Sequence, residues 1–210
     1  MNSRTTPPGP PAAVAGRSEA PLLNIANALT VVRLVLVPVF IWLMFRSGDA
    51  VRLVAALVFA LAAATDRLDG QLARSRNLVT SFGKIADPIA DKALTLSAFV
   101  LLSVAGRLWW WVTVLIIVRE LGITLMRFVM LRRAVMAASR GGKLKTALQV
   151  TGIFGLLVPW AAFVPPVLAT ALDLTAYVLV GLALVVTLVT GADYVLKALR
   201  LSRANPGGRP

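Results

Sequence analysis

Four aspartates near the middle of the chain lie at spacings that can assemble a metal site. Asp66 and Asp69 are three residues apart, and Asp87 and Asp91 are four residues apart. Residues three or four apart share one face of a helix, so each pair would present two carboxylates to the same side. If the two helices are antiparallel and joined by a tight loop, all four carboxylates converge. Their mutual repulsion then requires cations between them.

The residue types available restrict which cations these are. The chain has no Cys and no His, which leaves acid–base and metal chemistry to nine Asp and Glu residues. Hard oxygen ligands suit Mg²⁺, Mn²⁺ or Ca²⁺ and disfavour zinc and copper. Two ions clamped by carboxylates are a common arrangement for displacement at a phosphorus centre. We therefore predict a site for two ions, Mg²⁺ or Mn²⁺.

Small and basic residues between the aspartates suit a phosphate-bearing substrate. Gly70 leaves a helix face open, so that a nucleotide or diphosphate can approach the backbone, and Gly83 fits the same use. Arg74 lies one turn beyond Gly70, where it can pair with a phosphate. With Ala73 and Thr80, these residues make up the predicted substrate-binding set of this stretch.

Each aspartate taken alone fits an ordinary role as a helix cap or an interfacial charge. The complete set does not, because eight fixed residue types at fixed spacing match by chance with a probability on the order of 10⁻⁹ per start position. The string Asp66-x2-Asp69-Gly70-x2-Ala73-Arg74-x8-Gly83-x3-Asp87-x3-Asp91 resembles the complete signature of the CDP-alcohol phosphatidyltransferases.

This resemblance implies a dimeric, six-helix membrane fold with a metal-bearing cavity open to the cytoplasm. It implies that Asp66, Asp69 and Asp87 hold the metals, and that Asp91 completes the site and acts as the base. It also implies CDP-diacylglycerol or a close CDP-lipid as the donor of a phosphatidyl group, and it leaves the acceptor alcohol open.

Three other segments bear on the acceptor. Asn24–Arg33, with Asn27 and Thr30, resembles the opening of the bacterial phosphatidylglycerophosphate synthase subfamily, which usually has Pro in place of Ala26. Two further stretches also resemble that subfamily, Arg119-Glu120 and Gly142–Thr146 with Lys143 and Lys145. The resemblance implies glycerol 3-phosphate as acceptor, a dianion for which fixed cations are suited.

These cations also fit roles that involve no substrate. Lys143 and Lys145 suit the excess of basic residues in cytoplasmic loops, and Arg119 suits a structural ion pair with Glu120. Inositol phosphate is anionic as well, so a phosphatidylinositol phosphate synthase is the alternative. A small transporter is a more remote one, because it should place ionisable groups near mid-membrane on several helices.

The composition of the chain predicts which helices position these residues. Hydrophobic residues make up 58% of the 210-residue chain and charged residues 15%, against about 25% charged in a soluble domain. We predict an all-α integral membrane protein with six transmembrane helices. The apolar segments are Leu29–Phe45, Val51–Ala64, Ile89–Ala105, Leu108–Leu131, Ala147–Val164 and Val167–Leu196.

The second segment is short, but its pattern continues through Asp66 and Leu72, so we expect that helix to emerge from the bilayer still wound. The stretch Pro21–Leu29 is compatible with a short interfacial helix before the first span. Residues 1–21 are predicted to be a disordered tail, residues 22–200 the membrane domain, and residues 201–210 a C-terminal tail.

Basic residues set the predicted orientation. They concentrate in the connections after the second and fourth segments and in the C-terminal tail, so both termini and the aspartates should face the cytoplasm from the cell membrane. The run Trp109–Trp111 suits an aromatic belt on the outer side. The net charge of +13 is dispersed between apolar runs, which fits a membrane surface and anionic substrates and not nucleic acid.

Overall fold

The computed structural model describes residues 25–75, 81–130 and 140–204, with the side chains of 26–27, 66–75, 81–88, 126–130, 140–143 and 193–204 excepted. This part of the chain is all-helical, as predicted. Six long helices and one short 3₁₀ turn, Trp160–Ala162, make it up. The helices are α1 (Ile25–Met44), α2 (Asp49–Ser75), α3 (Ser81–Val104), α4 (Trp110–Met130), α5 (Arg140–Leu157) and α6 (Pro166–Ala204).

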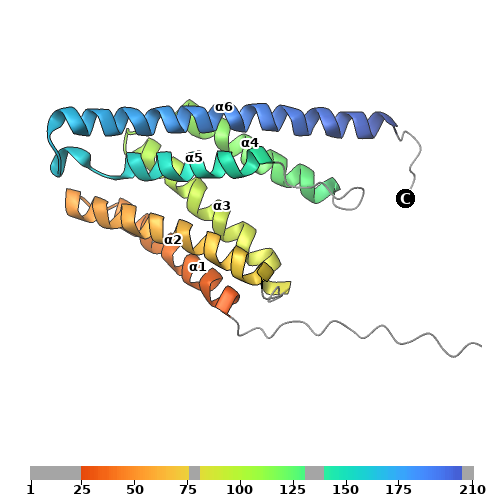
Figure 1. Cartoon of the computed structure of the whole chain (residues 1–210), viewed down its shortest axis with the longest axis horizontal. Coiled ribbons are helices and arrows are strands. Elements are labelled where there is room, and N and C mark those ends of the chain that lie inside the picture. Colours follow the sequence, from red (N-terminus) through yellow and green to blue (C-terminus); the bar gives the residue numbers. More distant parts are fainter. Residues whose placement is uncertain (1–24, 76–80, 131–139, 205–210) are drawn as a thin grey trace, which may run out of the picture.

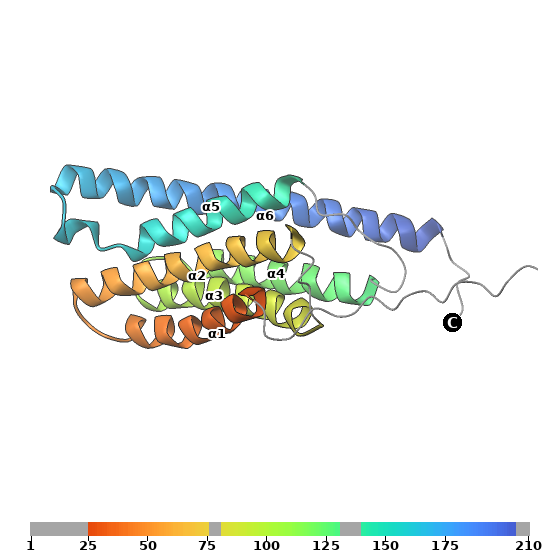
Figure 2. The same ribbon diagram turned by 60° about the horizontal axis from the view of Figure 1, so that its bottom comes forward.

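Consecutive helices run in opposite directions (Figures 1 and 2). The C-terminal ends of α2, α4 and α6 therefore lie at the same end of the bundle as the N-terminal ends of α1, α3 and α5. We call this the motif end, because the aspartate string lies on the last turns of α2 and the first turns of α3. The opposite end, which contains the α3–α4 turn, is called the far end. Helix α3 contacts α1, α2, α4 and α5, so residues on it can meet side chains from most of the bundle.

Close packing of α5 on α6 depends on two glycines of α5. A Cβ atom added at Gly152 would lie 2.8 Å from Cγ2 of Val180, and one added at Gly155 would lie 2.7 Å from Cβ of Ala176. Both distances are shorter than van der Waals contact, so these positions admit only glycine at this helix separation. Small residues of this kind let helix backbones approach closely where lipid removes the hydrophobic drive for association.

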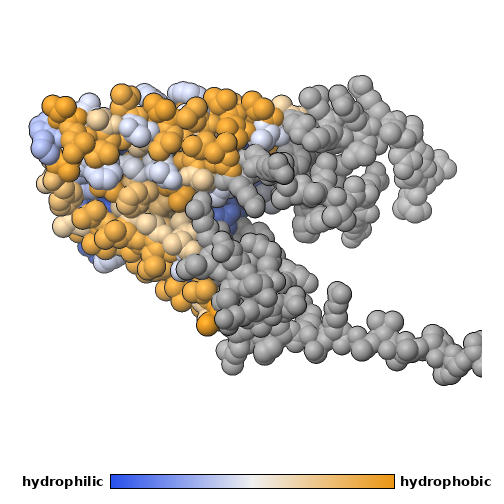
Figure 3. Space-filling view, in the orientation of Figure 1, coloured by the Kyte–Doolittle hydropathy of each residue, from blue (hydrophilic) through white to orange (hydrophobic). Residues whose placement is uncertain are grey.

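The outer surface of the bundle is apolar. Large hydrophobic side chains are exposed on α1, α2, α4 and α6, among them Val35, Leu57, Val118 and Val189. Figure 3 shows hydrophobic residues over most of the described part of one face. The segment Pro166–Ala192 of α6 is long and apolar enough to cross a bilayer. These features support a membrane protein, while six crossings remain a prediction.

Several helix boundaries differ from the apolar segments. Helix α5 was expected over Ala147–Val164 but spans Arg140–Leu157, because polar residues extend it at the start and Pro159 lies just after its end. Helix α2 continues to Ser75, which confirms that it stays wound past its apolar part. Ile25–Leu29 forms the start of α1 and not a separate interfacial helix, since the helical pattern runs on without a break.

Candidate functional site

The aspartate string lies where α2 and α3 meet. Asp66, Asp69, Gly70, Ala73 and Arg74 are on the last turns of α2, and Gly83, Asp87 and Asp91 are on the first turns of α3. The two helices contact each other, and both place these turns at the motif end (Figure 2). Thr80 lies between them, outside the described residues. The antiparallel arrangement expected from the sequence is therefore present.

The donor set fits hard divalent cations. Asp66 and Asp69 keep their three-residue spacing on a helix, as Asp87 and Asp91 keep their four-residue spacing, so each pair shares a helix face. All four donors are carboxylate oxygens, which Mg²⁺ and Mn²⁺ favour. Among the described side chains no group of three or more acids could hold a metal, since Asp91 is the one member of the set whose side chain is described.

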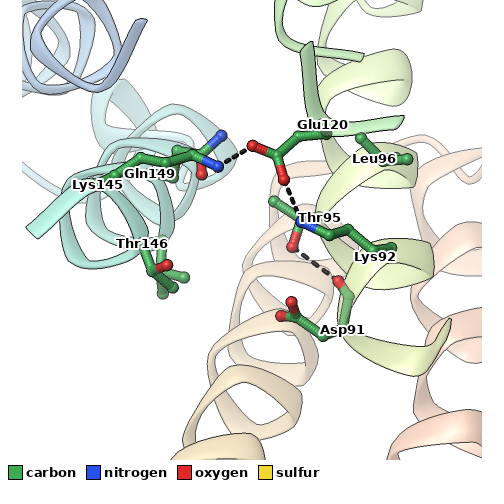
Figure 4. Close-up of a pocket in the computed structure, with 9 residues that line it drawn as sticks. Asp91, Lys92, Thr95, Leu96, Glu120, Lys145, Thr146 and Gln149 are labelled. Atoms are coloured by element: carbon green, nitrogen blue, oxygen red, sulfur yellow. Dashed lines mark hydrogen bonds and ion pairs between the residues drawn. The ribbon is translucent and has the colours of Figure 1, made fainter. Parts of the chain in front are cut away.

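Two adjoining hollows open beside Asp91. Both are lined by Asp91 and Thr95 of α3 and by Thr146 and Val150 of α5. The first extends to α4 and has a cavity volume of about 20 Å³, and its lining is shown in Figure 4. The second extends toward α1 and α2, where Arg33 forms part of its wall. A small substrate in either hollow would lie next to the Asp91 carboxylate.

Three cations surround one buried carboxylate in the wall of the first hollow. The Glu120 carboxylate, 4% exposed, forms ion pairs with Lys92 of α3 and Lys145 of α5. Its Oε1 also accepts a hydrogen bond from Nη1 of Arg119 at 2.9 Å. Lys145 is itself buried, whereas the Lys92 side chain is 32% exposed, and Asp91 lines the same hollow. Lysine and arginine donors that meet in the wall of a hollow suit an anionic ligand such as a phosphate.

Arg119 is also tied to α6. Its Nε donates to the backbone oxygen of Thr187 at 3.0 Å, and its Nη2 donates to Oγ1 of Thr190 at 2.7 Å. Gly191 makes room for it, because a Cβ there would lie 3.2 Å from Cγ of Arg119. These bonds fit the structural ion pair weighed for Arg119. Direct contact of its guanidinium with substrate stays a prediction.

Helix α1 brings the other predicted residues to the same region. Thr30 and Arg33 are fully buried, and α1 packs against α3. Asn27 lies in the first turns of α1 and Lys143 in the first turn of α5, and their side chains are outside the described set. The predicted residues thus come from α1 to α5, and all of these helices meet around α3 or next to it.

Sequence reasoning missed Lys92 and Gln149. Both line the first hollow, Lys92 directly after Asp91 and Gln149 four residues after Lys145 on α5. The available signal was a charged or amide side chain inside an otherwise apolar stretch, which marks a functional candidate in a membrane helix. Arg33, quoted only as part of a similar segment, is a further wall residue.

A helical membrane bundle with paired aspartates on two adjacent helices, next to a cationic hollow, is the kind of site that handles phosphate-bearing lipids. The chain belongs to the CDP-alcohol phosphatidyltransferase family, whose model matches residues 23–194. It is similar to named relatives over most of its length.

One relative, from Mycobacterium tuberculosis strain H37Rv, is called a probable phosphatidylglycerophosphate synthase. It is 50% identical over 190 residues, which cover 89% of this chain and 86% of the relative. A Bacillus subtilis relative is named CDP-diacylglycerol–glycerol-3-phosphate 3-phosphatidyltransferase. It is 33% identical, and the match covers 84% of this chain and 95% of the relative. A Rickettsia typhi relative with the same name is 35% identical, covering 81% and 94%.

Proposed function

We propose that this protein transfers the phosphatidyl group of CDP-diacylglycerol to sn-glycerol 3-phosphate and releases CMP. The product is phosphatidylglycerophosphate, a precursor in phospholipid biosynthesis. In this reaction the C1 hydroxyl oxygen of the acceptor forms a bond to the lipid-side phosphorus. The bond from that phosphorus to the oxygen of CMP breaks, and the hydroxyl proton leaves to a base.

The observation that carries this proposal is the cationic cluster beside Asp91. Lys92, Arg119 and Lys145 meet at Glu120 in the wall of the hollow that Asp91 also lines. A phosphorylated acceptor offers these cations an anionic partner, whereas serine and inositol carry no phosphate. The names of the relatives, which specify glycerol 3-phosphate, support the same acceptor.

The carboxylates of Asp66, Asp69, Asp87 and Asp91 would hold two Mg²⁺ or Mn²⁺ ions. When bound, these ions would neutralise charge on the diphosphate and make CMP a better leaving group. The Asp91 carboxylate accepts the proton of the acceptor hydroxyl, since it lines both hollows. Arg74 and Gly70, on the turns of α2 that precede α3, would bind the donor's phosphates. One in-line step suffices, because none of the residues proposed for the site is a Ser, Cys or His nucleophile.

The proposal also assigns the enzyme a location and an orientation in the cell membrane. Six spans would cross the cell membrane with the motif end and both termini in the cytoplasm, where glycerol 3-phosphate is dissolved. Exposed Trp109, Trp110 and Trp111 at the far end would then belong to the outer interface. The tails 1–21 and 201–210 would flank the membrane domain, although α6 continues to Ala204. We further propose a homodimer, as the family resemblance implies.

The experiment is a comparison of acceptors. Purified full-length protein with CDP-diacylglycerol and Mg²⁺ is offered glycerol 3-phosphate, inositol 1-phosphate, inositol or serine, and CMP release is measured. Glycerol 3-phosphate should be strongly preferred, and EDTA should abolish the release until Mg²⁺ or Mn²⁺ is returned. A preference for inositol 1-phosphate would overturn the acceptor while leaving the family in place. Full activity in EDTA would overturn the metal site.

A further inference from the structure

The side chain of Gln149 contains a buried polar group for which the described part of the chain provides no partner. It is 3% exposed, and its Nε2 is buried with no hydrogen-bond partner among the described residues. A buried donor left unpaired costs about 1–3 kcal/mol, and such groups are uncommon in folded proteins. Gln149 lines the first hollow. A ligand in that hollow that accepts a hydrogen bond would remove the cost.

The depth of Gln149 indicates which part of a ligand it meets. Helices α3 and α5 both begin at the motif end, so higher residue numbers on each lie further into the bundle (Figure 1). Asp91 and Lys145 are on the outer turns of the lining, and Thr95 and Gln149 lie one turn deeper. The Thr95 hydroxyl already donates to the backbone oxygen of Asp91 at 2.8 Å.

Figure 4 shows Lys145 and Gln149 extending from α5 toward the same side, where Glu120 lies. An acceptor whose hydroxyl lies at Asp91 therefore has its other end directed toward Lys145 and the deeper amide. In a phosphorylated alcohol that other end is the phosphate. Amide N–H groups and ammonium groups are both good donors to phosphate oxygens.

We propose that the acceptor binds with its phosphate innermost, where Nε2 of Gln149 donates a hydrogen bond to a phosphate oxygen. This inference rests on the proposed function and assigns a binding role to a residue outside the aspartate string. It also gives the bound acceptor one orientation, with its hydroxyl toward Asp91 and its phosphate deeper in the bundle.

The test uses Gln149→Met, which keeps the side-chain length and removes the donor, and Gln149→Glu, which places a carboxylate against the phosphate. Thr151→Val, on an exposed position of the same helix, is the matched control. For each full-length variant, KM for glycerol 3-phosphate, KM for CDP-diacylglycerol and kcat are measured by CMP release. The melting midpoint in detergent is measured without substrate and with glycerol 3-phosphate alone.

Gln149→Met should raise KM for glycerol 3-phosphate about 10- to 100-fold, with kcat and KM for CDP-diacylglycerol unchanged. Gln149→Glu should raise it further. The melting midpoint without substrate should not fall in Gln149→Met, because the unpaired donor has been removed, but the upward shift caused by glycerol 3-phosphate should be lost. If Gln149 had only a structural role, Gln149→Met would lower the melting midpoint and leave KM for glycerol 3-phosphate unchanged. That result would overturn the proposal.

A rise in KM for CDP-diacylglycerol would show that the amide meets the donor's diphosphate, and it would equally overturn the proposal. Failure of the proposed function has a different signature, which is seen in the wild-type protein. If wild type prefers inositol 1-phosphate, the same variants are measured with that acceptor, since the inference concerns the phosphate that both acceptors share.

Discussion

Two groups of charged residues in this bundle differ in balance and burial. At the far end, Nη2 of Arg107 donates to Oδ1 of Asp173 at 2.6 Å, with both side chains about 30% exposed. The Tyr177 hydroxyl donates to the backbone oxygen of Arg107 at 2.8 Å, which ties α6 to the α3–α4 turn. Next to Asp91, one buried carboxylate of Glu120 meets three cations.

The difference separates a structural contact from a binding site. The pair at the far end is neutral as a whole and joins α6 to the α3–α4 turn. Nε of Arg107 is buried with no hydrogen-bond partner among the described residues, but no hollow with converging cations lies beside it in the part of the chain that the structure describes. The Glu120 cluster gathers three cations and lies beside the buried amide of Gln149, whose Nε2 has no hydrogen-bond partner among the described residues. Because lysine, arginine and amide N–H groups are good donors to phosphate oxygens, the second group is suited to bind an anion.

The largest expected effect comes from the same substitution made in the two regions. Asp91→Asn should lower kcat by about 10²–10⁴-fold, because the acceptor hydroxyl loses its base, while CDP-diacylglycerol still binds. Asp173→Asn is the matched control and should leave kcat unchanged. Rates of CMP release at saturating substrates provide the measurement. If Asp91→Asn kept near-normal turnover, the assignment of Asp91 as the base would be wrong.

A smaller effect, mainly on stability, is expected at Glu120. Glu120→Gln leaves Lys92, Arg119 and Lys145 without their shared carboxylate, and breaking a buried ion pair costs about 3–5 kcal/mol. The free energy of unfolding, measured in detergent, should fall by that order. Glycerol 3-phosphate should stabilise this variant more than wild type, because its phosphate replaces the lost charge. Glu120→Asp keeps the charge, so its free energy of unfolding should lie between those of wild type and Glu120→Gln. If Glu120→Gln were as stable as wild type, the three cations would not need the carboxylate.

The smallest effect belongs to the far end. Asp173→Asn removes an ion pair that water reaches, and such pairs contribute about 0.2–1 kcal/mol. The free energy of unfolding should therefore fall by no more than that, with kcat and both KM values unchanged. A loss of activity in this variant would contradict the division between a structural end and a binding end.

The sequence predicted the six helices and the positions of the aspartates on them, while the roles of the site residues stay predictions. Long apolar segments defined six helices, and the i,i+3 and i,i+4 spacing of the aspartates placed them on α2 and α3. Helix ends were less accurate, as at α5, because hydropathy marks the apolar part of a helix while caps and prolines mark its ends. Gln149 and Lys92 were missed because their importance depends on which faces of α3, α4 and α5 meet, which is tertiary information.

The central claim is that the cationic cluster recognises the acceptor's phosphate, and one ratio measures it directly. The kcat/KM for glycerol 3-phosphate is divided by that for free glycerol, in wild type and in Lys145→Met, where Glu120 keeps Lys92 and Arg119 as partners. The ratio should be high in wild type and fall about 10- to 100-fold in the variant, with kcat/KM for glycerol unchanged. If the two acceptors instead lose activity in parallel, Lys145 supports the fold and does not read the phosphate, and the claim is wrong.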